Sequence, residues 1–222
     1  MGPDRSSPLP IFRWDASIPY AETAQRQEKQ VAQNQECLIF CEHPPTITLG
    51  TGAEWSDLAC SPVYYERMGL CVHKSPRGGK ATYHGPGQLV CYPILNLRDR
   101  EFTIHAYLRF LEDLMLHLCA SYGIQACRRE GKAGAWVEER KIGFIGVRVR
   151  RGFAFHGCSL NVAPQQEAFR LIVPCGMPNL PVTSIQEETG LSLSVWDVAD
   201  KMEVIFLTLL NTYSLEAPLV CT

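Results

Sequence analysis

A run of twelve residues, Arg77–Gln88, combines residue types that suit the binding of a ligand. It holds four glycines, one proline, one histidine and two basic residues between two apolar stretches. Paired glycines let the backbone approach a ligand closely, and Gly85-Pro86-Gly87 predicts a sharp turn with little freedom. His84 precedes that turn, so its imidazole is a candidate to face a pocket. The alternative is a glycine-rich hairpin whose histidine bonds only to backbone, because isolated glycine patterns often match by accident.

A cysteine in a loop is the second candidate for chemistry. Cys175 lies between Pro174 and Gly176, whereas Cys37 and Cys119 fall in apolar runs typical of packed interiors. A thiolate can accept an acyl group from a thioester, and an amine can then take that group from the acyl-enzyme. The thiolate is the reactive form, and a neighbouring ammonium favours it. From its own surroundings in the sequence, Cys175 stays open between a reactive and a structural thiol.

Four segments, in order along the chain, resemble the signature of the lipoyl(octanoyl) transferase family. The family patterns are RGG followed by HGPGQ, then KI-x3-G, then FHG-x-x-LNV, then PCG followed by VTS. The matching residues are Arg77-Gly78-Gly79 with His84–Gln88, Lys141-Ile142 with Gly146, Phe155-His156-Gly157 with Leu160-Asn161-Val162, and Pro174-Cys175-Gly176 with Val182-Thr183-Ser184. The resemblance covers about residues 70–185 and is specific, whereas the first sixty residues and the last helix add little to it.

The resemblance implies an enzyme that moves an octanoyl group from octanoyl-acyl carrier protein to a lysine of a lipoyl domain. Cys175 would be the nucleophile and Lys141 its partner, which stabilises the thiolate first and later helps to remove a proton from the incoming amine. Without the resemblance, Lys141 would be interpreted as a surface lysine, since it follows two glutamates and an arginine. The expected acceptors are the lipoyl domains of 2-oxoacid dehydrogenase E2 subunits and the glycine cleavage H protein. No cofactor and no metal are expected.

The resemblance also implies the walls of an acyl pocket. The expected substrate-binding residues are Arg77, Gly78, Gly79, Lys80, Ala81, Thr82, Tyr83, His84, Phe144, Ile145, Gly146, Gly157, Cys158 and Ser159. His84 would orient the thioester carbonyl or steer the leaving thiol, and backbone N–H groups near the glycines are candidate oxyanion donors. His156 is interpreted as structural. Cys158 departs from the pattern and would bring a second thiol near the reactive one.

The positions of these residues require a core of strands and helices. The expected strands are Cys37–Cys41, Thr46–Leu49, 70–73, 89–94, 134–137, 141–150 and 153–162, with a turn at Arg151-Gly152. The expected helices are 18–33 with Ser17 as cap, a short helix from Ser61-Pro62, one capped by Thr103 and ended by Gly123, 165–171, and a last helix opened by Ser194 with Asp197 in a capping box. Strands, then a helix, then more strands predict one α+β domain over residues 1–222. Its mixed or antiparallel sheet would be flanked by helices and resemble the biotin protein ligase and lipoate ligase catalytic domains.

The helix after Thr103 has a clear apolar stripe at helical spacing. Its other face carries His105, Arg109, Glu112 and Asp113, and His105 and His117 are therefore expected at the surface or at its flank.

Composition excludes several classes of protein. The chain has 222 residues, of which 46% are hydrophobic, and a net charge of −2. This charge gives no reason to expect a nucleic-acid or membrane partner, and no apolar run reaches the length of a membrane span. The 10 cysteines form no C-x2-C pair, and the first ten residues do not resemble a signal peptide,. These observations favour a reducing cytoplasm.

Three alternatives stay open. The basic residues Arg128, Arg129, Lys132, Arg148, Arg150 and Arg151 form either a dock for an acidic carrier protein or a solvated strand edge. An ATP-dependent lipoate ligase would share the fold and a lysine like Lys141, but it needs no nucleophilic cysteine. A non-catalytic lipoyl-domain or metal-binding module is the third possibility, against which the set of His84, Lys141 and Cys175 argues.

Overall fold

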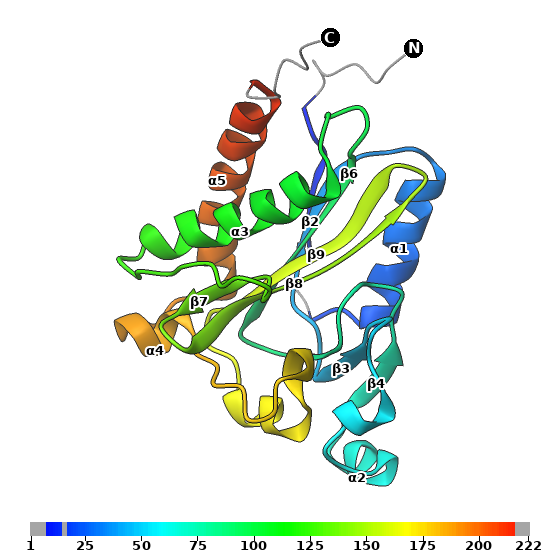
Figure 1. Cartoon of the computed structure of the whole chain (residues 1–222), viewed down its shortest axis with the longest axis vertical. Coiled ribbons are helices and arrows are strands. Elements are labelled where there is room, and N and C mark those ends of the chain that lie inside the picture. The colour runs from blue at the N-terminus through cyan, green and yellow to red at the C-terminus, as the bar shows by residue number, and fades with distance from the viewer. Residues whose placement is uncertain (1–7, 15–16, 216–222) are drawn as a thin grey trace.

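The computed structural model describes residues 8–14 and 17–215, which fold as a single α+β domain with two sheets (Figure 1). The larger sheet has six strands in the order β1-β2-β6-β9-β8-β7, and the smaller has three in the order β4-β3-β5. Parallel pairs β1–β2 and β3–β4 are combined with antiparallel neighbours, so both sheets are mixed. The expected fold class is confirmed.

The larger sheet carries most of the residues that the sequence singles out. Its strands are β1 (Ile11–Trp14), β2 (Cys37–Cys41), β6 (Gln88–Asn96), β7 (Ala135–Val137), β8 (Arg140–Arg150) and β9 (Phe153–Asn161). The long hairpin β8–β9 turns at Arg151-Gly152, where both residues have positive φ (53° and 89°) as a tight hairpin turn requires,. Strand β1 is absent from the sequence-based expectations.

The smaller sheet corrects one of those expectations. Its strands are β3 (Thr46–Leu49), β4 (Cys71–Lys74) and β5 (Ala81–His84). Residues 81–84 were expected to belong to a loop that reaches from strand 70–73 to strand 89–94. They pair instead along the whole length of β3, from Leu49 to Thr46. The glycines on both sides favour the prediction of a loop, although the four residues between them, Ala-Thr-Tyr-His, suit a strand.

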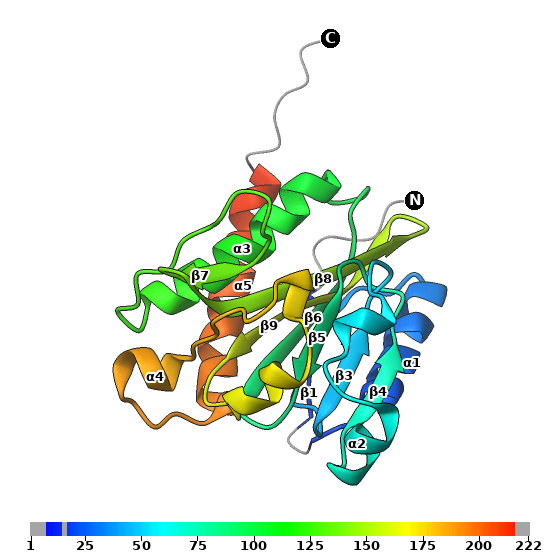
Figure 2. The same ribbon diagram turned by 60° about the horizontal axis from the view of Figure 1, so that its bottom comes forward.

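Helices cover the two faces of the larger sheet unequally (Figures 1 and 2). Helices α3 (Ile104–Ala120) and α5 (Val195–Leu215) pack on one face, and α1 (Tyr20–Ala32) covers part of the other. The short helices are α2 (Pro62–Arg67), α4 (Ile185–Thr189), and the 3-10 turns η1 (Trp55–Asp57), η2 (Gln166–Leu171) and η3 (Pro174–Gly176). Thus the expected helix at 165–171 is a 3-10 segment. None of the helices in the described ranges is long and apolar enough to cross a membrane.

The helix ends show which local sequence signals determine where a helix begins. Thr103 accepts a hydrogen bond from the N–H of Ala106, and Ser194 and Asp197 form the expected capping box. The Ser17 prediction is wrong, because α1 begins at Tyr20 with Pro19 at the cap position and no side-chain cap. Residues before proline favour extended backbone, and the N–H of Ile18 donates to the carbonyl of Glu42 (3.0 Å),.

Candidate active site

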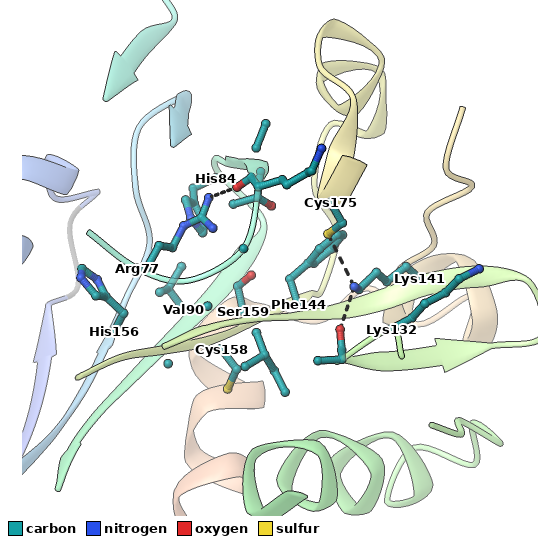
Figure 3. Close-up of a pocket in the computed structure, with 18 of the residues that line it drawn as sticks. Arg77, His84, Val90, Lys132, Lys141, Phe144, His156, Cys158, Ser159 and Cys175 are labelled. Atoms are coloured by element: carbon teal, nitrogen blue, oxygen red, sulfur yellow. Dashed lines mark hydrogen bonds between the residues drawn. The ribbon is translucent and has the colours of Figure 1, made fainter. Parts of the chain in front are cut away.

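A cavity of about 460 Å³ lies between the smaller sheet and the face of the larger sheet that α3 and α5 leave open. The loop before β5 and β5 itself form one wall, and strands β6, β8 and β9 form the other (Figure 3). Side chains alternate across a strand, so on β6 the Val90 and Tyr92 side chains line the cavity while Cys91 enters the core beneath α3,. The volume falls in the usual range of small-molecule sites.

Lys141 and Cys175 meet at one end of this cavity. Lys141 is the second residue of β8, and Cys175 lies at the centre of η3, thirty-four residues later. The Lys141 Nζ lies 3.6 Å from the Cys175 Sγ and also donates to the carbonyl of Ala133 at 2.8 Å (Figure 3). An ammonium at this distance stabilises a thiolate by Coulomb attraction and a charge-assisted hydrogen bond.

The Lys141 side chain is buried and enclosed. Its residue is 2% exposed, and its Nζ lies 5.0 Å from the Trp136 ring centroid and 5.2 Å from that of Phe144. Burial lowers the pKa of Lys141, while the charges of Cys175 and Glu112 act to raise it,. A buried lysine with a lowered pKa is suited both to donate and to accept a proton during a reaction.

The backbone of Lys141 is tied to the segment that carries Cys175. Lys141 donates its N–H to the carbonyl of Pro181 (2.9 Å), and its carbonyl accepts from the N–H of Thr183 (3.0 Å). Val182 therefore pairs in parallel with Lys141 as an isolated bridge. The Val182-Thr183-Ser184 motif thus has a physical role, because it fixes the start of β8 beside the cysteine loop.

Cys175 occupies an unusual backbone conformation. Its φ of 56° and ψ of 19° lie in the left-handed region, which non-glycine residues adopt at a cost, and Gly176 follows with φ 71°,. The residue is neither fully buried nor fully exposed. A Cβ at position 176 would lie 2.4 Å from the Lys80 Cδ, so the glycine also leaves room for that side chain.

Arg77 organises the glycine-rich wall. Its guanidinium donates to the carbonyl and hydroxyl of Thr48 and to the carbonyls of Gly78 and Lys80. A Cβ at Gly146 would lie 2.7 Å from the Arg77 Cδ, so the final glycine of the KI-x3-G motif leaves room for the Arg77 side chain to pack against β8. Gly78 donates its N–H to the carbonyl of Val147 (2.9 Å), which joins this wall to the larger sheet.

The end of the cavity opposite Cys175 carries aromatic and imidazole rings beside the guanidinium of Arg77 (Figure 3). The Tyr20 ring stacks parallel to those of His84 and His156. Burial lowers the pKa of both imidazoles to about 3, helped by His43 at His84 and by Arg77 at His156. His84 Nδ1 pairs with Gln88 Oε1 at 2.7 Å. Both ring nitrogens of His156 are buried without a hydrogen-bond partner among the described residues, and its φ is 59°.

The structure brings most of the predicted site residues to this cavity. Those that line it are Arg77, Gly79, Lys80, Ala81, Thr82, His84, Lys141, Phe144, Ile145, Gly146, Gly157, Cys158, Ser159 and Cys175. Gly78 is absent from the lining and serves as a backbone link instead. Tyr83 is also absent, because alternation along β5 turns its ring into the smaller core against Phe169. The role of His84 toward a thioester stays a prediction, and a neutral imidazole would act there by hydrogen bonding.

Cys158 does not face Cys175. It lies opposite Cys91 in the β6–β9 register and belongs to the core under α3. Figure 3 shows its sulfur on the other side of the strand from Cys175. The expectation of a second thiol beside the reactive one is therefore wrong.

Several cavity residues escaped sequence reasoning. Tyr20, Val90, Tyr92, Gly131, Lys132, Ala133, His156 and Met177 also line it. His156 had been interpreted as structural, although its place in the FHG motif was a usable signal. Tyr20 gave no signal, because only the packing of α1 on the larger sheet brings its ring to the cavity.

The basic residues do not form one cluster. Arg128, Arg129 and Lys132 precede β7, whereas Arg148, Arg150 and Arg151 lie at the far end of eleven-residue β8, roughly 30 Å from its start,. Arg128 pairs with Glu112 and Asp113, Arg129 with Glu139, and Arg150 with Glu28. The six residues therefore do not form the one local cluster that was expected, and the choice between a carrier dock and a solvated strand edge stays a prediction.

Comparisons with known proteins identify the structural class to which this fold and site belong. The chain is similar to lipoate-protein ligase A bound with ATP, at a TM-score of 0.71 and 14% identity over 95% of this chain and 94% of that chain. It is also similar to the biotin acetyl coenzyme A carboxylase synthetase of Helicobacter pylori, at a TM-score of 0.53 and 14% identity over 95% and 82%. At these identities the likeness shows the fold alone, which is that of the lipoate and biotin ligase catalytic domains.

The sequence comparisons narrow this class. The family described as "Lipoyl protein ligase A/B catalytic domain" matches residues 20–207. The curated relatives include several bacterial octanoyltransferases. That of Citrifermentans bemidjiense is 40% identical over 207 residues, which cover 91% of this chain and 98% of the relative. The chain belongs to the lipoyl protein ligase A/B catalytic-domain family. It groups there with the octanoyltransferases and is a transferase that serves protein lipoylation.

Proposed function

We propose that this chain transfers an octanoyl group from octanoyl-acyl carrier protein to the lysine ε-amine of a lipoyl domain, through a thioester on Cys175. The observation that carries the proposal is the 3.6 Å contact between Lys141 Nζ and Cys175 Sγ at one end of a cavity about 460 Å³ in volume. Lys141 and Cys175 are the catalytic residues, and the wall from Arg77 to His84 faces strands β8 and β9 across the acyl chain.

In the first half of the reaction, the Cys175 thiolate attacks the carbonyl carbon of the donor thioester. A new carbon–sulfur bond forms, the bond to the carrier's sulfur breaks, and the departing thiolate takes a proton from Lys141. In the second half, the neutral Lys141 accepts a proton from the attacking amine of the acceptor, and the Cys175 thiolate leaves. Atoms and protons balance without ATP or any other co-reactant, and the enzyme returns to its starting state.

The partners follow from this chemistry and from the relatives. The donor is a carrier protein whose thioester reaches Cys175, and the basic residues Lys80 and Lys132 at the cavity support contact with an acidic carrier,. The acceptors are lipoyl domains of 2-oxoacid dehydrogenase E2 subunits and the glycine cleavage H protein. The enzyme acts as one catalytic domain in the cytoplasm.

The second candidate function is an ATP-dependent lipoate ligase, which the fold would also permit. The cysteine beside Lys141 favours the transferase, because a ligase activates the acid as an adenylate and leaves a thiol at this position without a role.

The test separates these candidates. The protein is incubated with octanoyl-acyl carrier protein without ATP, and intact mass with peptide mapping locates any adduct. We expect one octanoyl group on Cys175, absent from Cys175→Ser and retained in Cys71→Ser, which removes an exposed thiol remote in sequence. No adduct, together with lipoylation from free octanoate once ATP is added, would contradict the proposal and establish the ligase.

A further inference from the structure

Lys141 is positioned by a loop that precedes strand β7. This loop, residues 128–134, is called the Arg128–Gly134 loop below. The carbonyl of Ala133 accepts the 2.8 Å hydrogen bond from Lys141 Nζ. The backbone of Gly134 lies so close to the lysine that a Cβ there would be 2.8 Å from Lys141 Cε and 3.3 Å from Nζ. A displacement of this loop would therefore move the ammonium relative to Cys175.

The Arg128–Gly134 loop is held from helix α3 by the carboxylate of Glu112. One oxygen accepts from the N–H of Gly134 (3.3 Å), and the other accepts from Arg128 Nε (3.0 Å) and Arg109 Nη1 (3.1 Å). The Glu112 side chain is 7% exposed. A carboxylate this deeply buried is costly unless its oxygens are paired. The two bonds from Arg128 and Gly134 hold the loop at both ends against α3, and Arg109 pairs with the carboxylate from within α3.

The same carboxylate belongs to the electrostatic surroundings of Lys141. Burial lowers the pKa of Lys141, and Lys132 lowers it further, whereas Cys175 and Glu112 raise it. Arg109 and Arg128 pair with Glu112 and offset part of its charge.

We infer that Glu112 is a positioning residue of the acyl transfer: it fixes the Arg128–Gly134 loop so that the Ala133 carbonyl holds Lys141 Nζ against Cys175. Its negative charge also keeps Lys141 protonated during attack on the donor, when the departing thiolate needs a proton. This inference rests on the proposed thioester route and adds to it a residue remote from the substrate.

Two substitutions separate the two effects. Glu112→Gln keeps one acceptor oxygen, for the Gly134 N–H, but removes the charge and the second acceptor that holds Arg128. Glu112→Leu removes the charge and every acceptor. Glu36→Gln is the matched control, because the Glu36 carboxylate also accepts from an arginine, Arg100, and from a backbone N–H, that of Asn96.

The first readout is the ionisation of Lys141 itself, which needs no acyl carrier. Competitive labelling with acetic anhydride over a range of pH, followed by peptide mass spectrometry, reports the neutral amine at position 141. We expect Glu112→Gln to shift this titration down by about half a pH unit or more, and Glu36→Gln to leave it in place. The alkaline limb of the pH profile for octanoyl-enzyme formation should shift in the same direction, with a roughly tenfold loss of rate at pH 8.

The outcomes are distinguishable from failure of the proposed function. If no variant forms an octanoyl-enzyme, the wild type included, the thioester route is wrong. If the wild type forms it and Glu112→Gln matches Glu36→Gln in both the Lys141 titration and the rate, the positioning role is overturned. Should Glu112→Leu fail to fold, the comparison of the two glutamine variants still decides.

Discussion

The two ends of the cavity are built in opposite ways. The end at Cys175 and Lys141 has an ammonium against a thiol, a left-handed non-glycine backbone and partial exposure. The inner end at Tyr20, His84 and His156 is buried, and its imidazoles are held neutral. The comparison teaches that the same burial acts differently at the two ends. At Lys141 it lowers the pKa against the opposing charge of Cys175, whereas at the inner end it lowers the pKa of the imidazoles and keeps them neutral beside the charged Arg77. The following experiments test this division, from the largest expected effect to the smallest.

Removal of the thiol should have the largest effect. Cys175→Ala should lower octanoyl transfer by at least about 1,000-fold, because the acyl-enzyme can no longer form. The measurement is the steady-state transfer rate to a lipoyl domain. His156→Asn, which keeps a residue tolerant of the positive φ at the inner end, should retain more than about one tenth of that rate,. Equal losses in the two variants would abolish the distinction between the ends.

Removal of the ammonium comes next. Lys141→Ala should lower the rate by about 100-fold or more, because both the thiolate and the later proton transfer lose their partner. Lys141→Arg keeps the positive charge but cannot act as a base, because the guanidinium is not deprotonated. The Cys175 thiol of this variant should therefore still react with iodoacetamide, while transfer of the acyl group to the amine should fail. Lys132→Ala, a control that removes another ammonium at the cavity, should lower the rate by less than about tenfold. A Lys141→Ala enzyme with normal turnover would contradict the assigned role.

A single methyl group should displace the lysine. Gly134→Ala places a Cβ 2.4 Å from the Gly143 carbonyl and 2.8 Å from Lys141 Cε at a φ of 129°. We expect transfer to fall about tenfold, since small displacements of a reacting group are costly. Gly131→Ala is the control, because that residue also has a positive φ (70°) but nothing lies near its Cβ. The ratio of the two rates, measured with melting temperatures, separates displacement of Lys141 from general backbone strain.

The neutral imidazoles near the inner end should make the stability of the fold depend on pH. His43 has a folded pKa of about 4, and His84 and His156 have values of about 3, against 6.5 for the unfolded chain,. Between these values the unfolded state binds more protons, so the stability present above pH 6.5 is lost as pH falls toward 3.

Urea unfolding at pH 7.5 and 5.5 measures this loss. Each of the three histidines should contribute about 1 kcal/mol to the drop in the free energy of unfolding between the two pH values. His156→Asn should reduce that drop by about this amount. His105→Asn, an exposed position on α3, should leave it unchanged. A drop of the same size in all three proteins would mean that the inner imidazoles are charged in the fold.

Sequence reasoning succeeded where a residue's neighbours along the chain decide its structure. The expected strands 141–150 and 153–162 and their Arg151-Gly152 turn agree with β8 and β9. The caps at Thr103 and Ser194 follow from local residues, since each hydroxyl accepts from the backbone N–H three residues later. The signature motifs placed most of the cavity lining because they carry information about the family fold.

Sequence reasoning failed where segments distant in the chain determine the surroundings of a residue. Helical spacing places Glu112 on the outer face of α3, but the Arg128–Gly134 loop returns to cover that face, and the residue is 5% exposed. Cys158 was expected near Cys175, and only the pairing register of β9 turns its thiol to the other side of the sheet. The positive φ of Cys175 has no signature beyond the glycine that follows it.

The backbone bridge between Lys141 and Val182 has a consequence for how the enzyme loses activity on heating. The two hydrogen bonds fasten the lysine to a segment that begins only a few residues after the cysteine, so the pair can separate by local opening before the core melts,. The amides of Lys141 and Thr183 report that opening by hydrogen exchange. Inactivation at moderate temperature should follow their exchange rates, and refolding of the whole chain would not be needed to restore the enzyme on cooling.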